Sequence, residues 1–368
     1  MSEGLDRQRG KQNGAAGAAA RPRIEVEEHQ GSHFDFEARL IRDAREAAYG
    51  IRQEKFLQNS FRYATDAWTL KRAWERLEAG GGHAPGVDGL TYSDVPEDLV
   101  WKVMDGLQDS LRSGTYQPSP LRPRSISKAP SSPGAPAALR GLELPTIFDR
   151  TVGKAITLVI SPFLDPQFDD RSFGFRPHRD RARAVAHAIA TAEHEDRWIW
   201  VTADVKNAFP SIPISRLMDL IHSQLKNDNL KELIRSLIGD SKRKGIPQGQ
   251  PVSPLLLNLY LHHYLDRVWR ERFPNIPLLR AADDILLLCQ SKAEAANAVT
   301  NLEQTLNPTG CLLKDTTNGT IKDLKDGQVA NWLGLDIDRK GNEPALHIGE
   351  KAWFKLEESE LLGADARD

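Results

Sequence analysis

The chain has 368 residues, 40% hydrophobic and 27% charged, which is typical of a globular protein with two or three domains. Its net charge of −2 gives no general attraction to nucleic acid, so such a partner would need a local basic cluster. Its two cysteines, Cys289 and Cys311, offer neither a disulfide framework nor a zinc site, and no apolar run reaches the length of a membrane span. The start of the chain has no apolar signal-peptide core, and we expect a cytoplasmic location.

The N-terminal third predicts a disordered arm followed by helices. Residues 1–32 are rich in Gly, Ala, Arg and Gln and lack hydrophobic periodicity. We expect a polar helix over 35–60 and an amphipathic helix over 65–78, started by Thr65 or Asp66. After the turn PGVDG, a further helix is expected, ended by Gly114 and with one apolar stripe: Leu99, Val103, Leu107 and Leu111.

A basic zone follows. Residues 118–138 are rich in Pro and Ser and place Arg122, Arg124 and Lys128 in a strand-like alternation. Arg140 comes next, and then five more arginines: Arg171, Arg176, Arg179, Arg181 and Arg183. Local binding of phosphate requires such a zone inside a neutral chain, and a solvated charged face is the equally weighted alternative.

Carboxylates appear next to two apolar segments. The run WIWVTA predicts a buried strand that ends at Asp204. The stretch LLRAADDILLLCQ predicts two buried strands joined by a tight turn that carries Asp283 and Asp284. Taken alone, an Asp-Asp pair at a hairpin tip is more often a solvated turn than a site.

Helices and loops connect these segments. We expect helices over 214–225, 230–238 and 292–306, and a Gly/Pro loop (KGIPQGQPVSP) that leads into a long helix over 255–270. Residues 311–330 are expected to be irregular, residues 332–337 to form a strand, and the last residues to form a charged helix and tail.

The carboxylates acquire a chemical meaning if separate elements bring them together. Clustered carboxylates repel one another unless cations bind, and Mg²⁺ prefers carboxylate oxygens together with substrate phosphates. Two such ions, held about 3.5–4 Å apart, can activate a hydroxyl and stabilise a leaving pyrophosphate. This interpretation predicts two-metal phosphoryl transfer, with nearby basic residues for a triphosphate.

Seven segments resemble, in order, the motif blocks of reverse transcriptases of the group II intron and retron branch. They are PGVDG, RSISKAP with ALRGLELPTIFDR, SFGFRPHRD, VTADVKNAFPSI, GIPQGQPVSPLLLNLYL, RAADD and WLG, and they span about residues 65–337. The resemblance implies an α+β, right-hand polymerase fold with fingers and palm, the antiparallel palm sheet backed by helices. It implies fingers and N-terminal helices over 33–195, a palm over 196–340 and a short tail over 341–368.

The resemblance also implies roles for single residues. Asp204, Asp283 and Asp284 would be the catalytic carboxylates and metal ligands, with the backbone carbonyl of Val205, for two Mg²⁺ ions or Mn²⁺. Phe209 would be a steric gate against the ribose 2′-hydroxyl. Other positions match nucleotide-binding and nucleic-acid-binding residues of the family: Lys128, Arg140, Gln248 and Gly249 for the dNTP and Arg176, Trp332 and Gly334 for the template and primer.

Three departures from the family pattern stand out. Ala281 replaces the Tyr or Phe expected before the first hairpin aspartate. The usual Lys-Thr pair before the primer grip is not in place, and Lys314 and Lys322 are the nearby candidates. Too few residues follow WLG for the family's helical thumb. We therefore expect that a structured cognate RNA, a protein partner or an oligomer supplies the grip, or that the gene product is truncated.

Three functions remain in competition. The first is an RNA-directed DNA polymerase that extends a DNA or RNA primer on an RNA template. The second is a non-catalytic, maturase-like RNA-binding protein that keeps the fold. The third is the same DNA-synthesis chemistry in antiviral defence or a CRISPR-linked system, which the neighbouring genes would discriminate.

Overall fold

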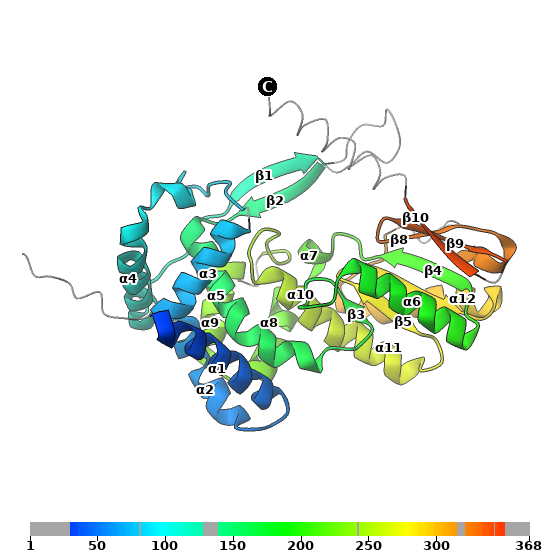
Figure 1. The fold of residues 1–368 in the computed structure, drawn as a ribbon, viewed down its shortest axis with the longest axis horizontal. Coiled ribbons are helices and arrows are strands. Elements are labelled where there is room, and N and C mark those ends of the chain that lie inside the picture. Colours follow the sequence, from blue (N-terminus) through cyan, green and yellow to red (C-terminus); the bar gives the residue numbers. More distant parts are fainter. Residues whose placement is uncertain are drawn as a thin grey trace, which may run out of the picture.

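The first half of the chain is mostly helical. A computed structural model describes residues 30–80, 82–127, 139–240, 243–314, 321–341 and 343–349. Apolar stripes pack the N-terminal helices around one long central helix, α5, whose apolar residues are almost all buried. Figure 1 shows them at one end of the molecule. These helices are α1 (Gln30–Ala48), α2 (Gln53–Ala64), α3 (Ala67–Ala79), α4 (Val100–Ser113) and α5 (Ile147–Leu164).

The second half is built on a five-stranded sheet with the strand order β3-β5-β6-β4-β7. All its pairs are antiparallel except the short parallel pair of β3 and β5. Its strands alternate side chains between two cores, which is why they are apolar on both faces. The strands are β3 (Ser172–Phe173), β4 (Ile199–Asp204), β5 (Leu278–Ala281), β6 (Asp284–Cys289) and β7 (Ile321–Asp323).

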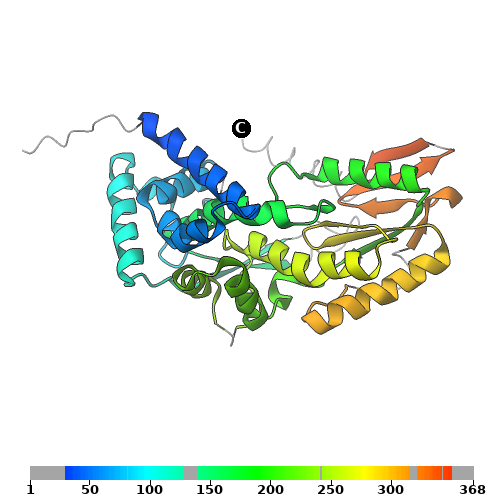
Figure 2. The same ribbon diagram turned by 90° about the horizontal axis from the view of Figure 1, so that it is seen from below.

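Helices cover both faces of this sheet, as Figure 2 shows. On one face, α6 packs with a three-stranded sheet in the order β10-β9-β8. The other face belongs to the larger core, which continues into the N-terminal helices. The covering elements are α6 (Arg181–Glu195), α7 (Ala208–Ser211), α8 (Ile214–Leu225), α9 (Asp228–Ile238), α10 (Ser253–Leu261), α11 (Arg267–Arg272), α12 (Lys292–Leu306), β8 (Ala330–Trp332), β9 (Leu335–Lys340) and β10 (Glu343–Ile348).

A separate hairpin lies between α4 and α5 in the chain. Strands β1 (Arg122–Ser127) and β2 (Leu139–Leu144) pair only with each other and project from the molecule in Figure 1. The strand expected around Arg122 and Arg124 is therefore confirmed. Among the helices of the described residues, none has both the length and the apolar character needed to cross a bilayer.

Several predicted elements match the structure and others need correction. Helices α8 and α12 have the predicted bounds, and Asp66 caps α3 by accepting a hydrogen bond from the amide of Trp68. The helix expected over 35–60 is two helices, because Gly50 and Arg52 adopt positive φ angles of 84° and 52°. The predicted stripe of α4 is wrong in part: Leu99 is 43% exposed, and Val100 and Met104 are buried instead.

The helix expected over 255–270 contains a π-helical turn, His262–Asp266, between α10 and α11. The single strand expected over 332–337 is a hairpin, because Leu333 and Gly334 form a two-residue turn with φ angles of 53° and 76°. Part of the region expected to be irregular forms β7, and part of the expected charged tail forms β10. The predicted arm lies almost wholly outside the described residues, as does the end of the tail.

Candidate active site

The ends of two neighbouring strands bring the predicted carboxylates together. Strands β4 and β6 run antiparallel in a register that places Asp204 directly opposite Asp284. Side chains at directly opposite positions project to the same face, with Cβ atoms about 4.5–5.5 Å apart. Asp204 follows a buried strand, yet its own side chain is 39% exposed, so the site lies where the sheet meets solvent.

Asp283 lies in the tight turn between β5 and β6, as predicted. Ala282, the residue before it, has a φ angle of 59°, which a two-residue hairpin turn requires. The amide of Val205 donates to the Asp283 carbonyl at 3.0 Å and ties the end of β4 to this turn. We call Ala282, Asp283 and Asp284 the aspartate turn.

Negative charge at the aspartate turn is only partly neutralised. Burial, together with the neighbouring charges of Asp283 and Asp204, raises the pKa of Asp284 to about 7. Lys314 lies with its Nζ 3.7 Å from Oδ2 of Asp204 and opposes this effect. Carboxylates that repel one another in this way suit a divalent cation.

The same residues do not form a finished metal cage. In the part of the chain that the structure describes, no three His, Cys, Asp or Glu side chains are grouped so that they could hold one metal ion. Lys314 is also anchored at this place by its backbone, because its amide donates to the Asp204 carbonyl at 2.8 Å. The donor chemistry therefore fits Mg²⁺, while the side chains need to turn before they can share an ion.

A buried arginine, Arg280, holds the backbone of the aspartate turn. Arg280 is fully buried, and its Nε and Nη2 donate to the two carboxylate oxygens of Asp266 at 2.8 and 2.7 Å. Its Nη1 donates to the Ala282 carbonyl and to Asn258, each at 2.8 Å, and its Nη2 also donates to Ser172 at 2.8 Å. All five N–H groups of the guanidinium therefore have acceptors, and one of these is the peptide that precedes Asp283.

The loop at residues 172–179 packs against the other side of this turn. The amide of Ala282 donates to the Phe173 carbonyl at 3.0 Å, and a Cβ at Gly174 would lie 2.8 Å from the Ala282 nitrogen. Gly174 also has a φ angle of 77°, so glycine is required here on both counts. The Asn258 amide donates to the Gly174 carbonyl at 2.9 Å.

The predicted nucleotide-binding residues that the structure describes in full lie on two segments. Phe209, in α7, is 8% exposed and its ring lies 6.4 Å from that of Phe175. The carbonyl of Gln248 accepts a hydrogen bond at 2.9 Å from Glu143 in β2, which connects its loop to the β1–β2 hairpin. A Cβ at Gly249 would lie 2.4 Å from the Glu143 carbonyl oxygen, so only glycine allows this close approach.

Other predicted residues lie apart from the site or are not described. Lys128 lies outside the described residues, and only the backbone of Arg140, opposite Ile126, is described. The prediction that Arg176 contacts nucleic acid needs correction, because its side chain is 3% exposed. Its guanidinium donates to Asp165 at 2.7 Å and to the carbonyls of Asp169 and Ser172, so it holds the loop in place.

The predicted primer-grip residues differ from each other. Trp332 is 2% exposed and packs in the smaller core, so its indole does not face a nucleic acid. Gly334 is half-buried at the tip of the β8–β9 turn, and its carbonyl accepts a hydrogen bond from the Gly349 amide at 3.1 Å. Of this pair, only the turn itself remains as a surface for a primer.

Reasoning from the sequence missed the Arg280–Asp266 pair and the position of Lys314 beside Asp204. Arg280 stands inside an otherwise apolar strand, and a charge there requires a buried partner. That signal was available, whereas the identity of the partner depends on how α10, α11 and β5 pack.

Comparison with known proteins places the chain in a family. The model of the family "Reverse transcriptase (RNA-dependent DNA polymerase)" matches residues 126–316, just over half of the chain. Protein YkfC of Escherichia coli (strain K12) is 30% identical over 223 residues, which cover 56% of this chain and 55% of that protein. The group II intron-encoded protein LtrA of Lactococcus lactis subsp. cremoris is 30% identical over 194 residues, 50% of this chain and 30% of that protein.

Among solved structures, a chain of the "Partial Cas6-RT-Cas1--Cas2 complex" is similar, with 23% identity, a TM-score of 0.39 and coverage of 67% of this chain and 40% of that one. The chain spans about half of YkfC and less than a third of LtrA. The fold is the predicted α+β, right-hand polymerase fold. The chain belongs to the reverse transcriptase family, of the group II intron type.

Proposed function

We propose that this protein extends the 3′ end of a DNA or RNA primer with dNTPs on an RNA template. The observation that carries the proposal is the register of β4 and β6, which sets Asp204 opposite Asp284 beside Asp283. A chain that only bound RNA would have no need for three carboxylates at one position where their charge is only partly neutralised.

Asp204, Asp283 and Asp284, with the Val205 carbonyl, would hold Mg²⁺ or Mn²⁺, and bound ions would activate the primer hydroxyl and stabilise the departing pyrophosphate. Lys314 neutralises Asp204 when no cation is present and would exchange its partner when one binds. We assign residues 33–195 to the N-terminal helices and fingers and residues 196–340 to the palm.

The remaining roles concern selection of the substrate. Phe209 would exclude a ribose 2′-hydroxyl, and its packing against Phe175 would hold the ring in position. Gln248 and Gly249 would support the incoming nucleotide, since their loop is bonded to β2. Lys128 and Arg140 would clamp the triphosphate, as cationic side chains suit phosphate oxygens.

Primer extension on an RNA template tests the proposal. We expect Asp283→Ala to lower dNTP incorporation at least about a hundredfold, because a charge that stabilises the transition state is lost. Asp219→Ala, which removes an exposed carboxylate from α8, is the matched control and should retain wild-type activity. Equal incorporation by Asp283→Ala and wild type, or none by wild type, would contradict the proposal.

A non-catalytic RNA-binding role is the second candidate. Ala281, which pairs with Asp284, is 8% exposed and offers no aromatic ring at the primer end. This role predicts tight RNA binding that is unchanged by Asp204→Ala and by removal of divalent cations. Wild-type primer extension separates the two candidates directly.

A further inference from the structure

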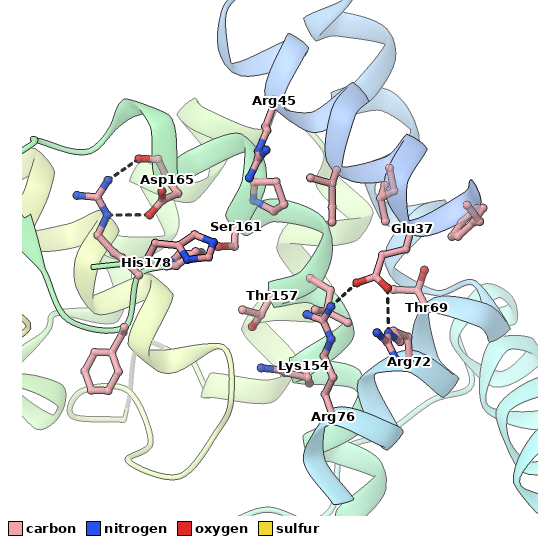
Figure 3. Close-up of a pocket in the computed structure, with 18 of the residues that line it drawn as sticks. Glu37, Arg45, Thr69, Arg72, Arg76, Lys154, Thr157, Ser161, Asp165 and His178 are labelled. Atoms are coloured by element: carbon pink, nitrogen blue, oxygen red, sulfur yellow. Dashed lines mark hydrogen bonds and ion pairs between the residues drawn. The ribbon is translucent and has the colours of Figure 1, made fainter. Parts of the chain in front are cut away.

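A cavity of about 860 Å³ lies between the N-terminal helices and the loop at residues 172–179. Figure 3 shows its walls, which come from α1, α3, α5 and this loop. Seven arginine and lysine side chains line it against three carboxylates, so the lining carries four more positive than negative charges in a chain whose net charge is −2. Its volume is in the range of known ligand sites.

Most of these cations are already paired within the protein. Arg72 and Arg76 both bind the carboxylate of Glu37, as the dashed lines in Figure 3 mark. Arg176 binds Asp165 at 2.7 Å. These pairs fix the walls of the cavity, although Arg72 and Arg76 share the one Glu37 carboxylate.

Two cations in the cavity remain without an ion-pair partner among the described residues: Lys154 of α5 and Arg45 of α1. Lys154 is half-buried, and burial together with the neighbouring charge of Arg76 lowers its pKa. Figure 3 shows Arg45 directed from α1 toward α5 near Ser161. A partly desolvated ammonium that lacks a carboxylate is stabilised by an anion from solution.

The wall formed by α5 supports the same conclusion. Lys154, Thr157 and Ser161 follow one another at spacings of three and four residues, so they share one face of the helix. The opposite face is packed into the main core. The polar face of this otherwise apolar helix thus lies on the cavity. The Thr157 hydroxyl donates to the Gly153 carbonyl at 2.9 Å, so the Lys154 ammonium and the Ser161 hydroxyl are the groups that can bind phosphate oxygens.

The cavity adjoins the candidate active site through one aromatic contact. Phe175 lines the cavity, and its ring contacts that of Phe209 at 6.4 Å. The preceding residue, Gly174, packs on the aspartate turn. The β8–β10 sheet, with the candidate primer grip, lies toward the other end of the molecule in Figure 1. A primer–template duplex on that side would leave the unpaired template on the side of the cavity.

We propose that this cavity binds the phosphate backbone of the single-stranded template on the 5′ side of the templating base, with Lys154 and Arg45 as its unpaired cations. The proposal rests on the proposed function, because it presupposes a template. It assigns to α1, α3 and α5 a role in holding the strand that has not yet been copied.

Binding of primer–template to the full chain tests the proposal without any need for catalysis. The probes are a labelled duplex with a single-stranded RNA 5′ overhang and the same duplex with a blunt end. We expect Lys154→Gln with Arg45→Gln to weaken binding of the overhang duplex on the order of tenfold at low salt. The slope of log K against log salt concentration should fall in magnitude by about two. Binding of the blunt duplex should not change.

Matched controls separate the cavity from general charge. Arg42→Gln with Lys102→Gln removes two exposed cations from α1 and α4 that do not line the cavity, and it should leave both affinities at the wild-type value. Lys154→Arg keeps the charge and should retain overhang binding. Circular dichroism and melting temperature confirm that each variant is folded.

Three outcomes would overturn the proposal: an equal loss for the blunt duplex, no loss for the overhang duplex, or an equal loss in the control variant. Inorganic triphosphate serves as a further probe in the binding experiment. If it binds wild type but not the Lys154 and Arg45 variant and does not compete with the overhang, the cavity serves a small phosphate compound instead. A failure of dNTP incorporation with overhang binding intact would count against the proposed function alone.

Discussion

Two cationic regions lie on opposite sides of the loop at residues 172–179, and they use positive charge in different ways. Beneath the aspartate turn, Arg280 is fully buried and every N–H group has a protein acceptor. In the cavity, Lys154 and Arg45 are partly exposed and have no ion-pair partner among the described residues. A fully satisfied buried cation fixes a backbone, while an unsatisfied one at a cavity remains available to a ligand.

Substitution of Arg280 should have the largest effect, because it tests whether the buried cation is structural. We expect Arg280→Met to reduce the free energy of unfolding by about 3–5 kcal/mol, because it leaves Asp266 buried without its partner. Chemical denaturation measures this loss. Arg270→Met is the matched control, since that arginine is 61% exposed and pairs with Asp169, and it should change stability by less than about 1 kcal/mol.

A double variant distinguishes positioning from stability. Arg280→Met with Asp266→Leu removes both charges and should recover much of the lost stability. The Ala282 carbonyl still lacks its donor, so we expect the Mg²⁺ concentration for half-maximal incorporation to stay above that of wild type. Recovery of both quantities would show that Arg280 stabilises the fold without positioning the turn.

Substitution of Asp284 is expected to change stability by a smaller amount and in the opposite direction, as a gain. Its folded pKa of about 7 lies above the ordinary aspartate value of 3.8, so the folded protein binds the proton more tightly than the unfolded chain. Stability therefore falls as pH rises from about 4 to 7, and the full penalty is present above 7. In the metal-free protein we expect Asp284→Asn to add on the order of 2 kcal/mol at pH 8 and less at pH 5.

Thermal melts of both proteins in a chelator, at the two pH values, measure this difference. The matched control is Asp219→Asn, an exposed position on α8, whose effect should be small and the same at both pH values. A gain at pH 5 that equals or exceeds the gain at pH 8 would contradict the assignment of the raised pKa to Asp284.

Local signals predicted the elements that depend on local periodicity. The bounds of α8 and α12 follow from apolar spacing and from their end residues, and the hairpin around Asp283 follows from two apolar runs. The convergence of Asp204 on that hairpin was expected through the family resemblance. Only the strand register gives it a physical basis.

Features that depend on packing between distant segments could not be predicted. Leu333 adopts a positive φ angle that its residue type does not favour, so a hairpin was mistaken for one strand. Trp332 and Arg176 were assigned to nucleic acid from their motifs, yet both are buried. Trp332 packs with residues far away in the chain, whereas Arg176 is held by Asp165 and by its own loop. The cavity beside α5 has no sequence signature, because its walls come from three helices and a loop.

The smallest predicted effect is the stability change caused by substitution of Lys154, and it distinguishes the two cationic regions most directly. Lys154 has a pKa below the ordinary lysine value of 10.5, so its charge disfavours the folded state at neutral pH. This penalty is lost as pH rises toward 10.5. We therefore expect Lys154→Met to raise stability slightly at pH 7, by less than about 1 kcal/mol since the side chain is partly exposed, while it weakens binding of the overhang duplex. Denaturation at pH 7 and pH 10 measures the first effect. A structural cation such as Arg280 must behave in the opposite way, so a loss of stability in Lys154→Met would place both regions in one class.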